Sequence, residues 1–191
     1  MRASNFKYPL MALTVVFVYL FASEFIRKDK CLDSGGSWNS PLQICETEAF
    51  AQVDLVKVDK SEAKMMLYSN GKLVREYKVV FGAVPQGHKQ QEGDEKTPEG
   101  IYTLDYKKED SSFYRAMHIN YPNQRDIINA DKLGVSPGGF IMVHGQRNYL
   151  GWLSSIMQNF NWTNGCIALT NEEMDDFMEL VSVGTKIQID W

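Results

Sequence analysis

Two residues of this sequence, Cys166 and His144, are suited to nucleophilic catalysis. A free thiol is only a few per cent thiolate at neutral pH, and an imidazole beside it raises that fraction and can later protonate a leaving amine. Such a pair therefore suffices for acyl transfer through a thioester. Cys166 follows Gly165, and a glycine lets the backbone approach a substrate closely. His144 ends the apolar run 140–143 and precedes Gly145, so a strand end would present its imidazole to a cleft.

The neighbours of this pair include candidates for stabilising a transition state and for binding a substrate. Backbone N–H groups at the cysteine and the glycine before it can stabilise an oxyanion. An arginine, or a lysine of the 85–96 loop, can hold a carboxylate, and Trp152 is a further candidate wall of the cleft. The candidates for oxyanion binding or support are Gly165, Asn164 and Gly145, and those for substrate binding are Arg147, Trp162 and Thr163. Solvated charges and core packing are the alternatives for the charged and aromatic members.

Other interpretations of the two central residues stay open at this point. A single cysteine is often a small core hydrophobe, and a histidine before a glycine is often structural. Zinc would need three protein ligands, and no ligand-like spacing joins Cys166 and His144 to a third residue, so neither a metal nor a cofactor is expected. His88 lies in a polar loop and His118 in an irregular stretch, so neither is a better partner for the cysteine.

The elements that must position this chemistry are predicted to be mostly strands. Apolar-rich runs at 55–58, 64–68 and 73–81 predict strands. Asn70-Gly71 lies between the last two runs and predicts a tight hairpin, because both turn positions need positive φ.

Further along the chain, turns and strands alternate. Residues 85–96 are polar and glycine-rich and predict a loop, 97–100 predict a turn, and a strand starts at Ile101. Residues 107–139 are predicted to be irregular. The uncharged run 140–143, bounded by glycines, predicts a buried central strand that ends at His144.

One helix is clearly marked near the C-terminus. Thr170 and Glu173 match a capping box, and apolar residues then recur at helical spacing. Residues 186–189 alternate as a last strand. Residues 51–191 are therefore predicted to form one mixed, mainly antiparallel β domain with a few helices.

The N-terminal segment has the pattern of a targeting or membrane-anchoring sequence. Residues 8–23 carry no charge and follow Arg2 and Lys7, which favours an N-terminus on the inner side of a membrane. The leading prediction is an uncleaved membrane anchor within residues 1–28, spanning through residues 8–26. A cleaved signal peptide and a buried core helix are the alternatives.

The following tether, residues 29–50, contains two cysteines. Cys31 and Cys45 bracket a short polar segment, which predicts a disulfide between them in an oxidising compartment and leaves Cys166 free. Two unpaired thiols are the alternative.

Composition excludes several classes of protein. The 191 residues fit one domain with a small appendage, and 44% hydrophobic with 23% charged residues argue against a disordered chain. The net charge is -4, whereas binding to the phosphates of a nucleic acid needs positive charge, so no nucleic-acid partner is expected.

Four features, in order along residues 53–189, resemble the L,D-transpeptidase catalytic-domain family of the YkuD type. They are the hairpin at 67–74 that leads to Gly82, the Thr-Pro-Glu-Gly turn at 97–100, the Val-His-Gly strand end at 143–145 and the Thr-Asn-Gly-Cys-Ile segment at 163–167. The resemblance implies a YkuD-type β-sandwich or barrel-like catalytic domain, with Cys166 as the nucleophile and His144 as general base and acid.

The sequence also departs from the family pattern. Many members carry His at the position of Asn164, and many carry Arg or Asn at the position of Ala168. His144 and Cys166 are 22 positions apart, a few more than in the commonest members. The extra chain, an aromatic-rich insert at 147–162, is expected to shape the cleft.

The resemblance implies a peptidoglycan L,D-transpeptidase that acts on stem tetrapeptides, making cross-links or exchanging amines. It further implies an inner-membrane protein with its catalytic domain in the periplasm, or a soluble periplasmic one if the N-terminal segment is cleaved. A cysteine hydrolase on the same fold, cleaving peptidoglycan peptide or lipoprotein links, is the first alternative. A non-enzymatic, membrane-tethered wall-binding module is the second. Stem peptides are the expected partners, and no protein partner is predicted.

Overall fold

The computed structural model describes residues 23–33, 37–39, 44–46 and 52–191 of the chain. The chain divides into two units, Met1–Phe50 and Ala51–Trp191. In the first unit, residues 23–33 are helical, and β1 (Ser37–Asn39) pairs with β2 (Ile44–Glu46) in an antiparallel hairpin. Among the helices that the structure describes, none has the length and hydropathy of a membrane span. The uncharged run lies outside the described residues except for its last residue.

The cysteines of the chain differ in state. Cys31 is buried and belongs to a disulfide, whereas Cys166 is a free thiol. The side chain of Cys45 lies outside the described residues, so its pairing with Cys31 stays a prediction.

The second unit is built on one eight-stranded sheet. Its strands are β3 (Val53–Asp59), β4 (Lys64–Ser69), β5 (Lys72–Lys78), β6 (Gly100–Ser111), β7 (Tyr114–Ile119), β8 (Met142–His144), β9 (Ile167–Ala168) and β10 (Val181–Asp190). The spatial order is β5-β4-β3-β10-β6-β7-β8-β9. β10 runs parallel to β3, and β9 runs parallel to β8; the other neighbours are antiparallel. The expected mainly antiparallel sheet is confirmed.

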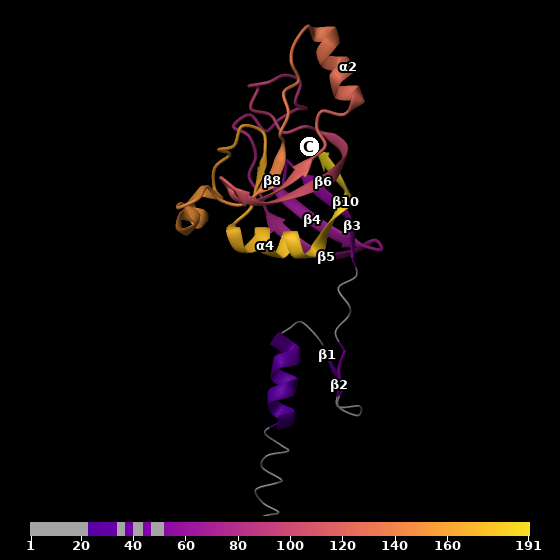
Figure 1. Cartoon of the computed structure of the whole chain (residues 1–191), viewed down its shortest axis with the longest axis vertical. Coiled ribbons are helices and arrows are strands. Elements are labelled where there is room, and N and C mark those ends of the chain that lie inside the picture. Colours follow the sequence, from indigo (N-terminus) through magenta and orange to yellow (C-terminus); the bar gives the residue numbers. More distant parts are fainter. Residues whose placement is uncertain (1–22, 34–36, 40–43, 47–51) are drawn as a thin grey trace, which may run out of the picture. The chain divides into compact units, whose positions relative to one another are not determined.

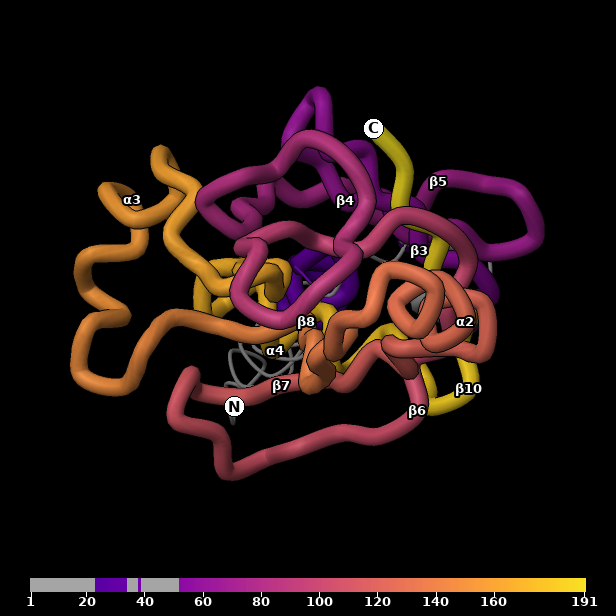
Figure 2. The backbone as a smooth tube through the Cα atoms, turned by 90° about the horizontal axis from the view of Figure 1, so that it is seen from above, coloured from indigo at the N-terminus to yellow at the C-terminus, as the bar shows by residue number. Residues whose placement is uncertain are grey.

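The sheet curls until its two ends meet. Just beyond β5, Val80 forms an antiparallel bridge to Ala168 of β9, with hydrogen bonds of 3.2 and 2.9 Å in the two directions. Figure 2 shows the curl from above, with β3 to β5 on one side and β6 and β7 on the other. The barrel-like fold is thereby confirmed, because the chain just beyond β5 is hydrogen-bonded to β9 at the other end of the sheet.

Local sequence explains why several elements form where they do. The hairpin between β4 and β5 turns at Asn70 (φ 50°) and Gly71 (φ 77°), as predicted. α4 (Asn171–Leu180) begins at N-cap Thr170 with both capping-box hydrogen bonds to Glu173, also as predicted. Figure 1 shows α4 at one end of this unit and α2 (Gln124–Leu133) at the other.

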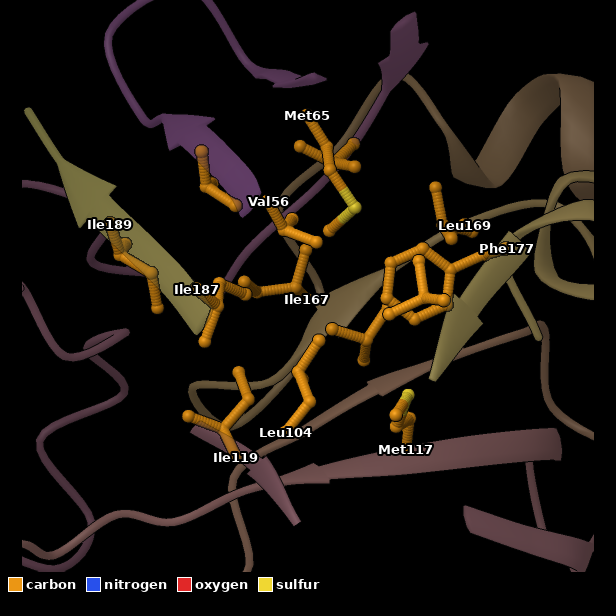
Figure 3. Packing of buried hydrophobic residues seen from close by; sticks show 14 of the residues in the cluster. Val56, Met65, Leu104, Met117, Ile119, Ile167, Leu169, Phe177, Ile187 and Ile189 are labelled. Atoms are coloured by element: carbon orange, nitrogen blue, oxygen red, sulfur yellow. The ribbon is translucent and has the colours of Figure 1, made fainter. Parts of the chain in front are cut away.

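The interior of the curled sheet holds one hydrophobic core. Strand residues alternate in exposure, so one face of each strand points inward. In Figure 3, Leu104, Met117 and Ile167 from separate strands lie in one cluster with Phe177 of α4. Burial of each large side chain contributes roughly 1.5–3 kcal/mol, so the core fixes α4 against the sheet.

The prediction of an irregular stretch at 107–139 is wrong. β6 continues to Ser111, β7 follows, and α2 lies within the same stretch. Much of β6 is exposed and carries charged residues, so its sequence lacks the alternation of apolar and polar residues that marks a strand. α2 buries only Asp126 and Ala130, so it lacks the apolar stripe that marks a helix; its Asn123–Asp126 capping box was the usable signal.

Candidate active site

Two neighbouring strand ends bring Cys166 and His144 together. His144 is the last residue of β8, and Cys166 immediately precedes β9, which pairs with β8 in parallel with Val143 opposite Ile167. By this register Cys166 stands beside Met142, whose side chain shares a face with that of His144. Both side chains line one cavity of about 510 Å³.

His144 is buried, only 4% exposed, against two aromatic rings. Its ring lies 4.7 Å from that of Phe113 and 5.7 Å from that of Trp162, between ring centres. Its Nδ1 lies 2.6 Å from the carbonyl oxygen of Gly145. A carbonyl oxygen only accepts, so Nδ1 carries the hydrogen and Nε2 has a free lone pair. Burial lowers the pKa of His144 to about 4, although the Gly145 bond acts the other way, so the imidazole is neutral at neutral pH.

Cys166 is a half-buried free thiol. Burial raises its pKa above the usual value, while a backbone hydrogen bond from Met142 and the charge of Lys89 oppose the rise. Its Sγ lies 3.7 Å from the carbonyl oxygen of Phe140. The resting site therefore holds a neutral thiol and a neutral imidazole in one cavity, an arrangement in which an imidazole can act as a base toward a thiol.

A short loop fixes the thiol. The Thr163 hydroxyl donates to the carbonyl of Cys166 (2.7 Å) and accepts from the N–H of Gly165 (3.2 Å). Gly165 has φ of 116°, and a Cβ there would lie 2.5 Å from the carbonyl oxygen of Lys96, so only glycine fits. The Gly165 N–H expected as an oxyanion donor is thus already engaged. Within the described part of the chain, the Cys166 N–H has no acceptor and is the remaining candidate donor.

Comparison with known proteins assigns this domain to a family. The family model for the L,D-transpeptidase catalytic domain (YkuD) matches residues 54–189. The chain belongs to this family. The match confirms the resemblance carried by the sequence motifs and, with the curled sheet, the YkuD-type fold.

Individual proteins are similar to most of this chain. The Escherichia coli (strain K12) protein named "Putative L,D-transpeptidase YafK" is 28% identical over 133 residues, which cover 66% of this chain and 46% of that protein. A mutant of the helical cell shape determining protein Pgp2 from Campylobacter jejuni is 28% identical with a TM-score of 0.57, covering 73% of this chain and 47% of that one. Bdellovibrio bacteriovorus Bd1075 is 26% identical with a TM-score of 0.51, covering 76% and 50%. The chain spans about half the length of these relatives.

The other predicted residues of the YkuD site separate into two groups. Asn164, Arg147 and Trp162 line the cavity, the first two exposed and Trp162 half-buried against His144. Thr163 also borders the cavity, but its hydroxyl is used within the loop. Trp152 is 78% exposed and does not line the cavity, so it is no wall of the cleft.

Most of the insert at 147–162 does not line the cavity, and Lys89 of the polar 85–96 loop is paired within its own loop. In the insert, η1 (Gly151–Leu153) leads into α3 (Ser154–Met157), and only Leu150 and Met157 join Arg147 and Trp162 in lining the cavity. Lys89 of the 85–96 loop is 3% exposed and paired with Asp94 at 2.8 Å, so it is unavailable to a substrate carboxylate.

Sequence reasoning missed four residues that line the cavity: Ser111 at the end of β6, Phe113 in the β6–β7 turn, Phe140 before β8 and Met142 at its start. Phe113 had no signal, because its whole stretch was predicted to be irregular.

Nδ1 of His88 accepts a hydrogen bond from the N–H of Glu99, and its Nε2 lies 3.3 Å from a carboxylate oxygen of Asp126, away from the cavity. His118 bonds to Asp105 and stacks on Tyr106. Within the described ranges, no group of three or more His, Cys, Asp and Glu side chains is arranged to hold a metal ion.

Proposed function

We propose that this protein is a peptidoglycan L,D-transpeptidase in which Cys166 is the nucleophile and His144 the general base and acid. The observation that carries the proposal is a free thiol sharing one cavity with a neutral, tautomer-fixed imidazole. Membership of the YkuD family supports the class of reaction. Similarity to Pgp2, whose name assigns it to helical cell shape, is consistent with a substrate in the cell wall.

The chemistry proceeds in two halves. Nε2 of His144 takes the thiol proton, and the Cys166 sulfur attacks the carbonyl of the L-centre of the diamino acid in a donor tetrapeptide. The tetrahedral oxyanion faces the Cys166 N–H. Its collapse breaks the bond to the terminal D-alanine, whose amine takes the proton from the imidazolium, and a thioester remains. An acceptor amine then attacks the thioester, giving a proton through His144 to the departing sulfur.

The test incubates the full chain with defined tetrapeptide muropeptides and follows protein and product masses. A protein mass increased by the acyl group, together with new cross-linked products, is expected. His144→Ala should abolish acylation near neutral pH, with a smaller loss at pH 9–10, where the thiol ionises unaided. Asn164→Ala, a change in the same cavity, should cost far less, and Asn164→His should be tolerated.

Other outcomes identify the alternatives. Shortened or released peptides without cross-links would favour a hydrolase that uses water as the acceptor. If Cys166 is neither acylated nor rapidly alkylated by an electrophile, and His144→Ala changes nothing, the proposal fails in favour of a wall-binding module with an incidental thiol.

We also propose that residues 8–26 anchor the protein in the inner membrane, with the catalytic domain on the periplasmic side and Cys31 bonded to Cys45. The uncharged run with its basic prefix, and the disulfide at Cys31, support this arrangement. A protease added to the periplasmic side should digest the domain, and full protection would refute the topology. Non-reducing peptide mapping that finds Cys166 in a bridge would refute the pairing.

A further inference from the structure

The peptide group between Gly145 and Gln146 makes two hydrogen bonds that point in opposite directions. Its carbonyl oxygen accepts from Nδ1 of His144 at 2.6 Å, and its N–H donates to Oδ1 of Asn171 at 2.8 Å. The peptide is planar, so its C=O and N–H directions cannot change independently. The Asn171 side chain therefore orients the whole peptide group through the Gln146 N–H. This orientation directs the Gly145 carbonyl toward the imidazole of His144.

Asn171 is held firmly in place for this contact. It is the first residue of α4, directly after N-cap Thr170, and Phe177 fixes α4 in the core. A Cβ on Gly145 would lie 2.8 Å from Oδ1 of Asn171, so the glycine permits the close approach.

The ends of the same peptide are also fixed. The N–H of Gly145 donates to the carbonyl of Arg115 at 3.1 Å. The side chain of Gln146, only 1% exposed, donates through Nε2 to the carbonyl of Leu169 at 2.7 Å. The segment after His144 therefore has one orientation, and Asn171 is the side-chain group that holds its central peptide.

We infer that Asn171 is a positioning residue for His144: it orients the Gly145–Gln146 peptide so that the imidazole keeps its hydrogen on Nδ1 and its lone pair on Nε2. The inference rests on the proposed role of His144 as the base. Without the amide oxygen, the Gln146 N–H loses its acceptor and the peptide can rotate. The Gly145 carbonyl then no longer selects one tautomer, and the wrong tautomer cannot take the proton of the thiol.

The experiment measures the rate at which iodoacetamide alkylates Cys166 in the full chain, from pH 6 to 10. His144, Cys166 and Arg147 are the titratable side chains among the described residues that line the cavity. Asn171→Leu should lower the rate at pH 7 roughly tenfold, the factor that corresponds to one hydrogen bond, and the deficit should shrink toward pH 10. Asn171→Asp keeps an acceptor oxygen and adds a negative charge that favours the imidazolium, so its rate at pH 7 should equal or exceed that of the unchanged protein.

Controls separate this inference from the proposed function. Glu172→Gln alters an exposed residue of the same helical turn and should leave the rate and its pH profile unchanged. If His144→Ala slows alkylation at pH 7 while Asn171→Leu does not, the inference is wrong and the proposed base stands. If His144→Ala has no effect either, the proposed function itself fails. If Asn171→Leu does not fold, as judged by near-UV circular dichroism, Asn171→Asp decides: a rate well below that of the unchanged protein contradicts the inference.

Discussion

At the scale of single residues, the site depends on keeping an imidazole uncharged. Phe113 and Trp162 cover His144, and the Gly145 carbonyl satisfies its one N–H. A neutral imidazole accepts the proton of a thiol that burial has made less acidic. In the proposed mechanism, burial therefore makes the thiol dependent on His144 as its base, and it keeps that imidazole neutral above about pH 4.

The buried histidine should make stability depend on pH. Its pKa of about 4 in the folded chain lies below the ordinary value of 6.5, so between these values the unfolded chain binds more protons. Stability from this group is complete above about pH 6.5 and is lost as the pH falls toward 4, by up to about 3 kcal/mol. Urea unfolding of the unchanged protein should therefore show a steeper loss from pH 6.5 to 4 than His144→Leu does. Equal slopes for the two proteins would show that His144 titrates normally.

At the scale of elements, the buried side chain of Lys60 holds the 85–96 loop, which packs against Gly165. Nζ of Lys60 donates to the carbonyls of Gly87 (2.9 Å) and Thr97 (3.1 Å) and to a carboxylate oxygen of Glu99 (2.8 Å). Burial lowers the pKa of Lys60, and the Glu99 carboxylate opposes that change. The same loop places the Lys96 carbonyl against Gly165, so the loop and the nucleophile segment must keep their relative positions.

Lys60→Met should destabilise the domain by about 3 kcal/mol, because it removes the charge that pairs with Glu99 and leaves two carbonyls without their donor. Chemical denaturation measures the loss. Lys108→Met, a change at an exposed lysine of β6, is the control and should stay within roughly 0.5 kcal/mol. A Lys60→Met protein as stable as this control would mean that the loop is held by other contacts.

At the scale of the whole molecule, the proposed catalytic residues and the hydrophobic core belong to one unit. The buried cluster runs from Val53 to Ile189, and every residue lining the cavity lies between Ser111 and Cys166. The unit Ala51–Trp191 therefore contains both the scaffold and the site.

Residues 51–191 expressed alone should unfold in a single cooperative transition. Iodoacetamide should alkylate Cys166 in this fragment at the same rate as in the full chain, within about twofold. Thermal unfolding followed by near-UV circular dichroism, with the full chain as reference, checks the first expectation. A fragment without a cooperative transition would show that residues 1–50 contribute to folding of the catalytic unit.

The features that could be predicted from the amino-acid sequence are those that depend on short-range signals. Asn70-Gly71 dictates its hairpin because both residues tolerate positive φ, and Thr170 with Glu173 starts α4 because they satisfy its first N–H groups. The apolar run 140–143 located the strand that ends at His144, but that strand begins only at Met142, and Phe140 before it is 80% exposed. The ordered motifs were enough to indicate the family.

The hydrogen-bond partners of the polar groups in the site depend on long-range packing. The Gly165 N–H is taken by Thr163, and the His144 tautomer is set through a peptide whose far side meets Asn171. Lys60 finds Glu99 across 39 positions of sequence. Buried donors and acceptors must be paired, but pairing acts through space after the core has closed. No local pattern specifies which distant residue will be the partner, because that choice is made by the packing of the whole sheet.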